Sequence, residues 1–302
     1  MERLLDSVLT ILGKYSFRIE KLDYPRNMKK RSIDIVAAGT NKKLLIKIIS
    51  SIDDIHYREA QELYGISYTL DIPSVIVSEL FNRNPMEDYV LYDRHGLPAI
   101  TPQTLESILS GREEVYVYYK RGEFYVNINR EKLRELREEK RMSLGDIALA
   151  LGVTRKAVYD YERGKMDINI DKAEKLVHLL GEEILEPIDV FRTPREGVEN
   201  QPDHITEARI ISEALEKGYR ITHAVNTVFD IALDMQGIRY TIVVEHHKEN
   251  RVLTKIEESE KLERVIEVRR AAIVQTPRLK REIERMGVDV VHGLRELEER
   301  LQ

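Results

Sequence analysis

The stretch from Ser143 to Gly164 constrains the fold most, because its capping and turn residues have the spacing of two short helices joined by a tight turn. Ser143 stands at an N-cap position, and Asp146 completes a capping box three residues later. Gly152 can adopt the left-handed conformation that ends a helix. Thr154 can cap a second helix, which Gly164 ends. These residues predict a helical hairpin.

The apolar residues of this stretch support the same structure. Ile147, Ala148 and Leu151 fall on one helical face, and Val158 and Tyr161 point back toward them from the second helix. A small residue at position 148 lets two steeply crossing helices approach closely.

The run resembles the helix-turn-helix of the Cro/C1 (XRE-type) DNA-binding family. The match rests on Ser143, Ile147, Ala148, Leu151, Gly152, Val153, Thr154, Arg155, Val158, Tyr161, Glu162 and Gly164. The flanks agree through Leu133, Leu136 and Arg137 before it, and Ile170, Ala173, Leu176, Val177 and Leu180 after it. Two residues depart from the pattern: Leu144 stands where many members carry a phosphate-contacting polar residue, and Gly145 is a poor helix former.

The resemblance implies that the second helix, from about Thr154 to Arg163, enters the major groove of double-stranded DNA. Since Val158 and Tyr161 belong to the core, the other side of this helix and the turn after it are left to contact DNA. The predicted DNA-binding residues are Thr154, Arg155, Lys156, Tyr159, Asp160 and Lys165.

Length and composition set the frame around this unit. A chain of 302 residues exceeds a helix-turn-helix module of about 60 residues, so further domains are expected. A formal net charge of −5 means that affinity for nucleic acid must be local. The absence of cysteine excludes disulfides and cysteine-based zinc sites and fits a cytoplasmic location. No signal peptide or membrane span is recognisable. No phosphate-cradling glycine loop or nucleophilic Ser/His/Asp cluster is recognisable either, which leaves a nucleotide hydrolase unsupported.

The region before this unit reads as an α/β domain. Helices are expected at 3–13, 55–66 and 102–109, and strands at 17–22, 33–37, 44–49 and 75–77. The alternating residues 115–128 predict a hairpin that turns at Arg121 and Gly122. Its tyrosines could stack on bases or bind a partner, or could simply pack on one face of the hairpin.

The C-terminal part repeats the N-terminal plan. A helix, a glycine and a strand recur, and Phe229 to Ala232 echoes Ile33 to Val36. Tyr240 to Glu245 likewise echoes Leu44 to Ile49, Ala271 to Val274 echoes Ser74 to Val77, and His292 to Leu294 echoes His95 to Leu97. These echoes predict a tandem duplication. The expected divisions are an N-terminal α/β domain (1–114), a hairpin connector (115–128), the helix-turn-helix domain (129–190), a linker (191–203) and a C-terminal α/β domain (204–302).

The element order of both copies also resembles restriction-endonuclease-like PD-(D/E)xK domains, in which an Asp and a Glu-x-Lys bind Mg²⁺ and orient water. The first copy has Asp34 and Lys47, but Leu45 stands where the second carboxylate belongs. The second copy has Asp230 and Glu245, but His247 stands where the lysine belongs. Neither set is complete, so both domains are expected to be degenerate, with no catalytic residue. Each Asp could instead cap a turn.

Two further features belong to these domains. Lys47 lies in an otherwise apolar strand and must reach solvent or a partner, and an ion pair with Asp34 would satisfy it. His246 and His247 with Glu245 could hold a metal, but neighbouring residues of a strand face opposite ways, so no metal ligand is predicted.

The sequence thus predicts an α+β multidomain protein in which a central all-α Cro/C1-type bundle is flanked by two repeated α/β domains. The whole arrangement resembles archaeal HTH-type transcriptional regulators, which implies a sequence-specific DNA-binding regulator. Because neither nuclease-like set is complete, no enzyme activity and no cofactor are expected. Since one recognition helix reads only a few base pairs, the protein is expected to bind as a homodimer. The alternatives are a metal-dependent nuclease or resolvase of the PD-(D/E)xK type, and an antitoxin-like protein that binds DNA and a partner. The sequence identifies no small-molecule effector.

Overall fold

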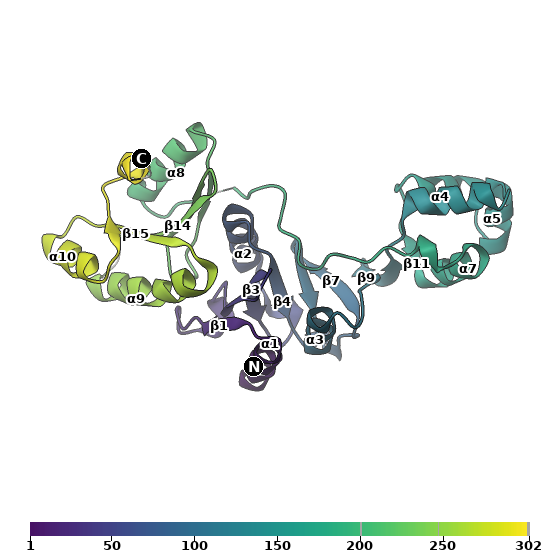
Figure 1. Ribbon diagram of the computed structural model, residues 1–302, viewed down its shortest axis with the longest axis horizontal. Helices are drawn as coiled ribbons and strands as arrows, with labels where there is room; N and C mark the ends of the chain where they lie inside the picture. Colours follow the sequence, from purple (N-terminus) through teal and green to yellow (C-terminus); the bar gives the residue numbers. More distant parts are fainter. Residues whose placement is uncertain (200, 247, 301–302) are drawn as a thin grey trace. The chain divides into compact units, whose positions relative to one another are not determined.

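The computed structural model describes residues 1–199, 201–246 and 248–300, and the chain divides into two compact units (Figure 1). The first unit combines residues 1–85 and 94–97 with the chain from 191 onward. The second unit contains residues 86–93 and 98–190. Both units mix helices and strands, as the sequence predicts.

The N-terminal part of the first unit is an α/β layer built on an apolar sheet. Its strands follow the order β1-β2-β3-β4, with β3 and β4 parallel and the other pairs antiparallel. Its elements are α1 (Glu2–Lys14), β1 (Arg18–Lys21), η1 (Met28–Lys30), β2 (Ile35–Ala38), β3 (Lys43–Ile48), η2 (Ile52–Asp54), α2 (Tyr57–Leu70), β4 (Ser74–Val77), β5 (Leu80–Phe81) and β6 (Asn84–Pro85).

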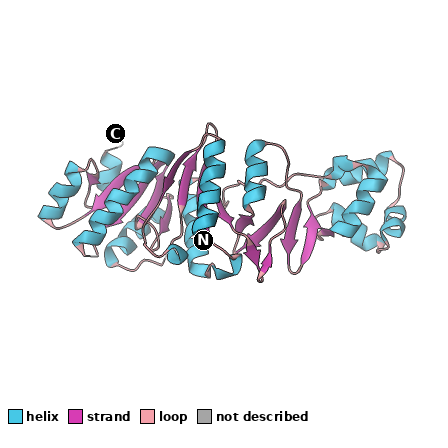
Figure 2. Cartoon of the chain, turned by 90° about the horizontal axis from the view of Figure 1, so that it is seen from below, coloured by secondary structure: helices cyan, strands magenta, loops and turns pink. Residues whose placement is uncertain are grey.

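The C-terminal part of the first unit has its own sheet, in the order β12-β13-β14-β15-β16, with helices flanking the strands (Figure 2). Its core gathers apolar residues from the strands and from the inward faces of the helices. Its elements are α8 (Ile205–Glu216), β12 (Arg220–His223), β13 (Ile231–Met235), β14 (Ile238–Val244), α9 (Glu249–Ile266), β15 (Arg269–Ile273), α10 (Pro277–Arg285), β16 (Asp289–Val290) and α11 (Leu294–Glu299).

Equivalent residues are paired in the same way in the two sheets of the first unit. Asp34 donates its backbone N–H to the carbonyl of Ile46, and Asp230 donates to the carbonyl of Ile242 in the same way. Ile46 pairs with Val75 in the first sheet, and Ile242 pairs with Ala271 in the second. The same number of residues separates each position of the first sheet from its equivalent in the second. One expected correspondence is wrong: the turn containing His95 and Gly96 precedes a strand, whereas His292 and Gly293 precede the helix α11.

The two halves of the first unit pack on each other through equivalent helices. Helix α2 of the first half packs against β12 and β13 of the second, and α9 of the second half packs against β1 and β2 of the first. Polar contacts cross the same boundary, including a buried hydrogen bond of 2.7 Å between the hydroxyls of Thr69 and Thr222. The packing is therefore reciprocal.

The second unit joins a small sheet to a helical bundle. Strands follow the order β8-β7-β9-β10-β11, and β9 and β10 form the predicted hairpin, with positive φ at Arg121 and Gly122 in its turn. Its elements are β7 (Val90–Arg94), β8 (Leu97–Ile100), α3 (Pro102–Ser110), β9 (Val117–Lys120), β10 (Glu123–Val126), α4 (Arg130–Glu139), α5 (Leu144–Leu151), α6 (Arg155–Glu162), β11 (Ile168–Asn169), α7 (Ile170–Leu180) and η3 (Glu182–Ile184).

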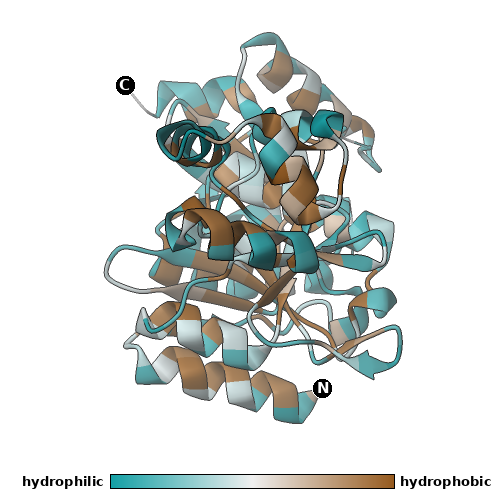
Figure 3. Cartoon of the chain, turned by 90° about the vertical axis from the view of Figure 1, so that its right-hand side faces the viewer, coloured by the Kyte–Doolittle hydropathy of each residue, from teal (hydrophilic) through white to brown (hydrophobic). Residues whose placement is uncertain are grey.

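Hydropathy follows this architecture: strands are mostly hydrophobic, and many helices alternate hydrophobic and hydrophilic bands (Figure 3). Across the described ranges, no helix is both long enough and apolar enough to cross a bilayer.

Candidate nucleic-acid interface

The capping box before α5 forms as predicted. The Ser143 hydroxyl accepts the backbone N–H of Asp146 at 3.2 Å, and the Asp146 carboxylate accepts the backbone N–H of Ser143 at 2.7 Å. The second bond, because it stabilises the charged carboxylate, holds the pKa of Asp146 below its usual value. Two otherwise unsatisfied N–H groups at the start of α5 are thereby paired.

The turn between α5 and α6 also has the predicted form. Gly152 ends α5 in the left-handed conformation, with φ 66° and ψ 39°. The Thr154 hydroxyl accepts the N–H of Ala157 at 3.1 Å and so caps α6. Because this oxygen caps the helix, the groups that Thr154 offers toward a phosphate are its backbone N–H and those of the first turn.

A compact core holds α4, α5, α6 and α7 together. Val158 and Tyr161 are buried, as the sequence predicts, and they pack with the apolar face of α5. An ion pair supports the same arrangement: the Arg137 guanidinium donates to both carboxylate oxygens of Glu162, at 2.6 and 3.3 Å, with both side chains largely buried. The bidentate geometry fixes α6 against α4.

The opposite side of α6 faces away from this core. Thr154, Arg155, Lys156 and Tyr159 are exposed, and Lys165 is exposed in the turn beyond the helix. Asp160 is partly buried, so its side chain is less available to a partner than the other five. The structure thus leaves five of the six predicted residues exposed, on α6 and in the turn beyond it.

Two features of this surface escape the sequence analysis. A Cβ atom on Gly145 would lie 2.8 Å from Nε of Arg155, so the absence of a side chain in α5 makes room for that guanidinium group. The Arg163 guanidinium lies 4.9 Å from the centre of the Tyr159 ring, which adds a cation to the outward side. The spacing of four residues between Tyr159 and Arg163 is the signal that could have revealed this pair.

The tyrosines of the β9–β10 hairpin pack mainly on one another. Tyr118 stacks on Tyr125 with ring centres 5.7 Å apart, and Tyr119 contacts both Tyr92 and Phe124. Burial and a hydrogen bond to Asp167 raise the pKa of Tyr118. This packing favours a structural role for the tyrosines.

The hairpin also contacts the turn that follows α6. Lys120 Nζ lies 2.6 Å from the Asp167 carboxylate. A side chain on Gly164, which has φ 72°, would overlap the Arg130 guanidinium. The Lys120–Asp167 pair therefore joins the hairpin to the turn after α6, and Gly164 lets that turn pass close to α4.

In the first half, Asp34 and Lys47, the two residues that match the PD-(D/E)xK pattern, form an ion pair. Lys47 Nζ lies 3.1 Å from Oδ2 of Asp34, and both side chains are fully buried, which confirms the predicted pair. Asp34 also accepts the N–H of Ile48 and lies 3.4 Å from Arg31. Burial raises the pKa of Asp34 despite these partners. The carboxylate is thus held by protein donors, and Leu45 lies opposite Val36 in the sheet.

The second half holds its buried aspartate differently. Lys255 of α9 reaches Asp230 at 2.5 Å, and the N–H of Val244 donates to the other carboxylate oxygen. The shared register places Thr241 and Val243 at the positions of Leu45 and Lys47. The expected assignment of Glu245 to the second carboxylate is therefore wrong.

Glu245 has another role. Its carboxylate accepts the N–H groups of Gln275 at 2.5 Å and of Thr276 at 2.9 Å, and so fixes the segment that leads into α10. The other residue of that assignment, His247, lies outside the described residues.

Comparisons with known proteins agree with both parts of this picture. The PD-(D/E)XK superfamily domain matches residues 1–115, and the helix-turn-helix family matches residues 133–186. A protein of Aeropyrum pernix named "Putative HTH-type transcriptional regulatory protein" is 40% identical over 257 residues, covering 83% of this chain and 78% of its own. Proteins with the same description from Sulfurisphaera tokodaii and Saccharolobus solfataricus are 32% and 29% identical, each covering 95% of this chain and 95% and 92% of their own. No solved structure matches the chain.

Proposed function

This chain belongs to the family of archaeal proteins that carry that regulatory name, and on this premise we propose that it regulates transcription by binding double-stranded DNA in a sequence-specific way. The observation that carries the proposal is the capped pair α5–α6, whose inward side is buried and whose outward side presents Arg155, Lys156 and Tyr159.

Each outward residue has a chemistry that suits one part of DNA. Arg155 can donate two parallel hydrogen bonds to guanine, and Lys156 can donate to guanine or to a phosphate. Asp160, one turn after Lys156, can accept from cytosine or hold Lys156 in place. Thr154 offers backbone N–H groups to a phosphate at the helix start, and Lys165 offers a phosphate contact beyond the helix end.

The experiment begins with genome-wide mapping of bound sites, followed by titration of purified protein on the site found. Arg155→Ala is expected to weaken operator binding by about 1–3 kcal/mol and to relax the preference at one base position. Arg295→Ala is the matched control, because its side chain is 88% exposed in α11 of the first unit. Unchanged affinity and base preference in Arg155→Ala would show that this face does not read DNA.

Lys165→Ala tests the phosphate contact separately. It is expected to weaken all sequences alike and to reduce the slope of log affinity against log salt by about one. A change in base preference instead would show that Lys165 contacts a base edge.

We further propose that the protein binds as a homodimer, since one recognition helix reads only a few base pairs. Two copies would occupy half-sites about one helical turn apart. Light scattering of the complex should give two chains per operator, and footprints should show a dyad or a direct repeat. A monomer both free and on DNA would contradict the dimer.

Nuclease activity is the second candidate, because residues 1–115 match the PD-(D/E)XK superfamily. We propose that this domain and its C-terminal counterpart are degenerate copies that flank the helix-turn-helix unit, with the boundaries expected from the sequence. Leu45 and Thr241 at the carboxylate position support this reading. Plasmid, branched and single-stranded DNA should remain intact with Mg²⁺ or Mn²⁺. Cleavage that disappears in Asp34→Ala or Asp230→Ala would establish the nuclease.

A further inference from the structure

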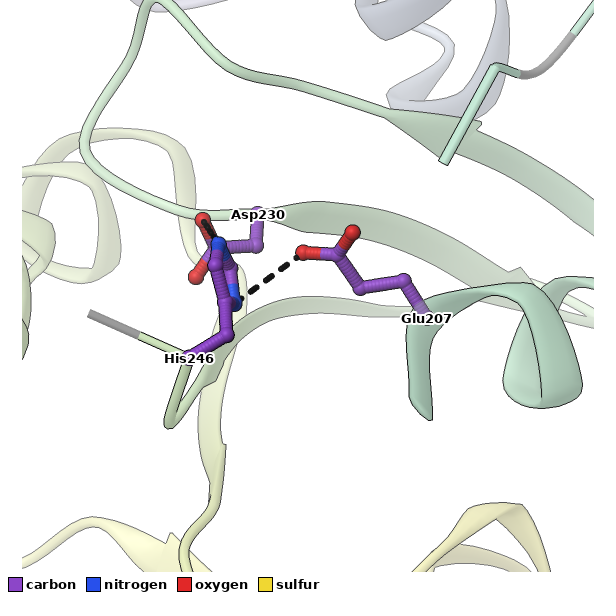
Figure 4. Close-up of side chains that lie close together, drawn as sticks. All are labelled: Glu207, Asp230 and His246. Atoms are coloured by element: carbon purple, nitrogen blue, oxygen red, sulfur yellow. Dashed lines mark ion pairs between the residues drawn. The ribbon is translucent and has the colours of Figure 1, made fainter. Parts of the chain in front are cut away.

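Three side chains from separate elements converge in the C-terminal half of the first unit (Figure 4). Glu207 extends from α8, Asp230 precedes β13, and His246 follows β14. His246 Nδ1 lies 3.3 Å from Oε1 of Glu207, and His246 Nε2 lies 3.9 Å from Oδ1 of Asp230. One nitrogen or oxygen atom from each residue lies within 4.8 Å of the others.

The glutamate of this cluster is anchored on one side only. Its Oε2 accepts the backbone N–H groups of Asp203 and His204, both at 3.1 Å, and lies 3.1 Å from Nε2 of His223. Its Oε1 is buried and accepts no hydrogen bond from the described residues. A fully buried carboxylate oxygen that lacks a donor is costly, and it is aimed at His246.

We propose that Glu207, Asp230 and His246 form a binding site for one divalent transition-metal ion. Two carboxylates and an imidazole suit Zn²⁺, Mn²⁺, Fe²⁺ or Co²⁺, whereas Mg²⁺ favours an all-oxygen shell. A separation of 3.3 Å between Oε1 and Nδ1 fits two ligands of one ion about 2 Å from each. A bound cation would also lie against Oε1, which accepts no hydrogen bond from the described residues.

Neighbouring groups hold Glu207 and His246 in place. His223 and the two backbone N–H groups orient Glu207 from behind, and the ring of His204 stacks on that of His246 with centres 5.6 Å apart. Such contacts fix the geometry of ligands.

One neighbour opposes a cation. Lys255 Nζ lies 2.5 Å from the same Asp230 oxygen that faces His246, so its charge lowers the affinity of the site for a dication. The site therefore holds a single ion more weakly than a site without that lysine would.

This site differs from the Mg²⁺ site that a PD-(D/E)xK resemblance implies, because Thr241 and Val243 occupy the strand positions of its second carboxylate and its lysine. It belongs to the second half alone. The matching backbone bonds of Phe17 to Leu12 and of Tyr219 to Ala214 align the two first helices, and Leu5 then occupies the place of Glu207. The proposal goes beyond DNA binding and does not depend on it.

The test uses the full-length protein after chelator treatment and dialysis, titrated calorimetrically with Zn²⁺, Mn²⁺ or Mg²⁺, and with Co²⁺ for its visible absorption. One equivalent of a transition metal should bind per chain, and Mg²⁺ should not compete. His246→Ala and Glu207→Gln should each weaken binding by about tenfold or more. His178→Ala, whose side chain is 79% exposed in α7, is the matched control.

Lys255→Met should change metal affinity in the opposite direction, and this variant removes no proposed ligand. With the competing ammonium removed, metal affinity should rise, and the metal should raise the melting temperature more than it does in the wild type. Circular dichroism establishes that each variant is folded. The proposal is overturned if no equivalent binds, or if folded His246→Ala and Lys255→Met both bind with wild-type affinity.

Discussion

At the scale of single residues, Gly145 has no side chain and so leaves room for the guanidinium group of Arg155. The backbone of α5 passes so close to Arg155 that a methyl group would contact its guanidinium group. Gly145 is helical, so alanine is tolerated by the backbone.

Gly145→Ala is therefore expected to separate stability from DNA binding. The variant should gain about 0.5–1 kcal/mol of helix stability while its operator affinity falls, because Arg155 must move. Thermal melts and operator titrations measure the two effects. Gly13→Ala is the matched control, since nothing lies within 4 Å of a Cβ there, and it should leave operator affinity unchanged. Equal operator affinity in both variants would refute a positioning role for Gly145.

The Asp34–Lys47 pair gives a second prediction at this scale. Lys47→Met should lower the free energy of unfolding by about 3–5 kcal/mol, because it leaves the buried carboxylate without its nearest cation. Adding Asp34→Asn should recover part of this loss, as measured by urea unfolding. A double variant as unstable as the sum of its parts would mean that the two charges are not coupled.

The sequence predicts this pair because a lone lysine in an apolar strand needs a nearby partner, and the adjacent strand supplies Asp34. It does not predict that Lys255 pairs with Asp230, because α9 must first pack before the two meet. The same reason hides the approach of Glu207 to His246, which come from separate elements. Contacts within a hairpin are readable from spacing, whereas contacts set by helix docking are not.

At the scale of elements, α5 and α6 are eight residues each, too short to be stable alone. Their caps fix where they begin and end, and the shared core keeps them folded. This is why their bounds follow closely from the sequence.

Leu151→Ala tests that dependence. It should destabilise the helical bundle by about 2–5 kcal/mol, because Leu151 is fully buried there. Hydrogen exchange should show the loss of protection in α5 and α6. Leu149→Ala is the matched control, since Leu149 is 85% exposed in the same helix and its truncation should change stability by less than about 0.5 kcal/mol. Equal effects of the two variants would show that the bundle does not rely on this core.

Other elements are not readable from pattern. The strands β7 and β8 lie in a stretch whose prolines at 85 and 98 weaken the alternation expected of strands. Helix α9 buries Lys255 and Ser259 together with its apolar residues, which blurs its periodicity. Tertiary packing decides both cases.

At the scale of the whole first unit, Glu62 of α2 links the two halves. Its carboxylate accepts the backbone N–H of Asn226 at 2.9 Å and the side-chain amide of Asn226 at 3.2 Å. Burial raises the pKa of Glu62 above its usual value despite these donors. The folded protein therefore binds this proton more tightly than the unfolded chain does.

Because the pKa of Glu62 is higher in the folded protein than in the unfolded chain, its contribution to the free energy of unfolding should fall as the pH rises from about 4.5 through the folded pKa. The contribution should stay low above that pKa. Glu62→Gln, which is neutral throughout, should flatten this part of the pH dependence and stabilise the protein at pH 8 relative to the wild type. Urea unfolding between pH 4.5 and 8 measures both. Glu260→Gln, 52% exposed, is the control. If the free energy of unfolding varied with pH in the same way in the wild type and in Glu62→Gln, a raised pKa of Glu62 would be contradicted.

The reciprocal packing of α2 and α9 has a consequence for how this protein behaves at low abundance. Two separate chains joined by such contacts would part on dilution, because their association depends on concentration. Here both halves belong to one polypeptide, so each meets the other at an effective concentration that does not depend on the number of molecules in the cell. The pairing is thus independent of expression level, and the two halves need not carry the same residues: Lys47 of β3 pairs with the buried aspartate of one half, and Lys255 of α9 pairs with that of the other.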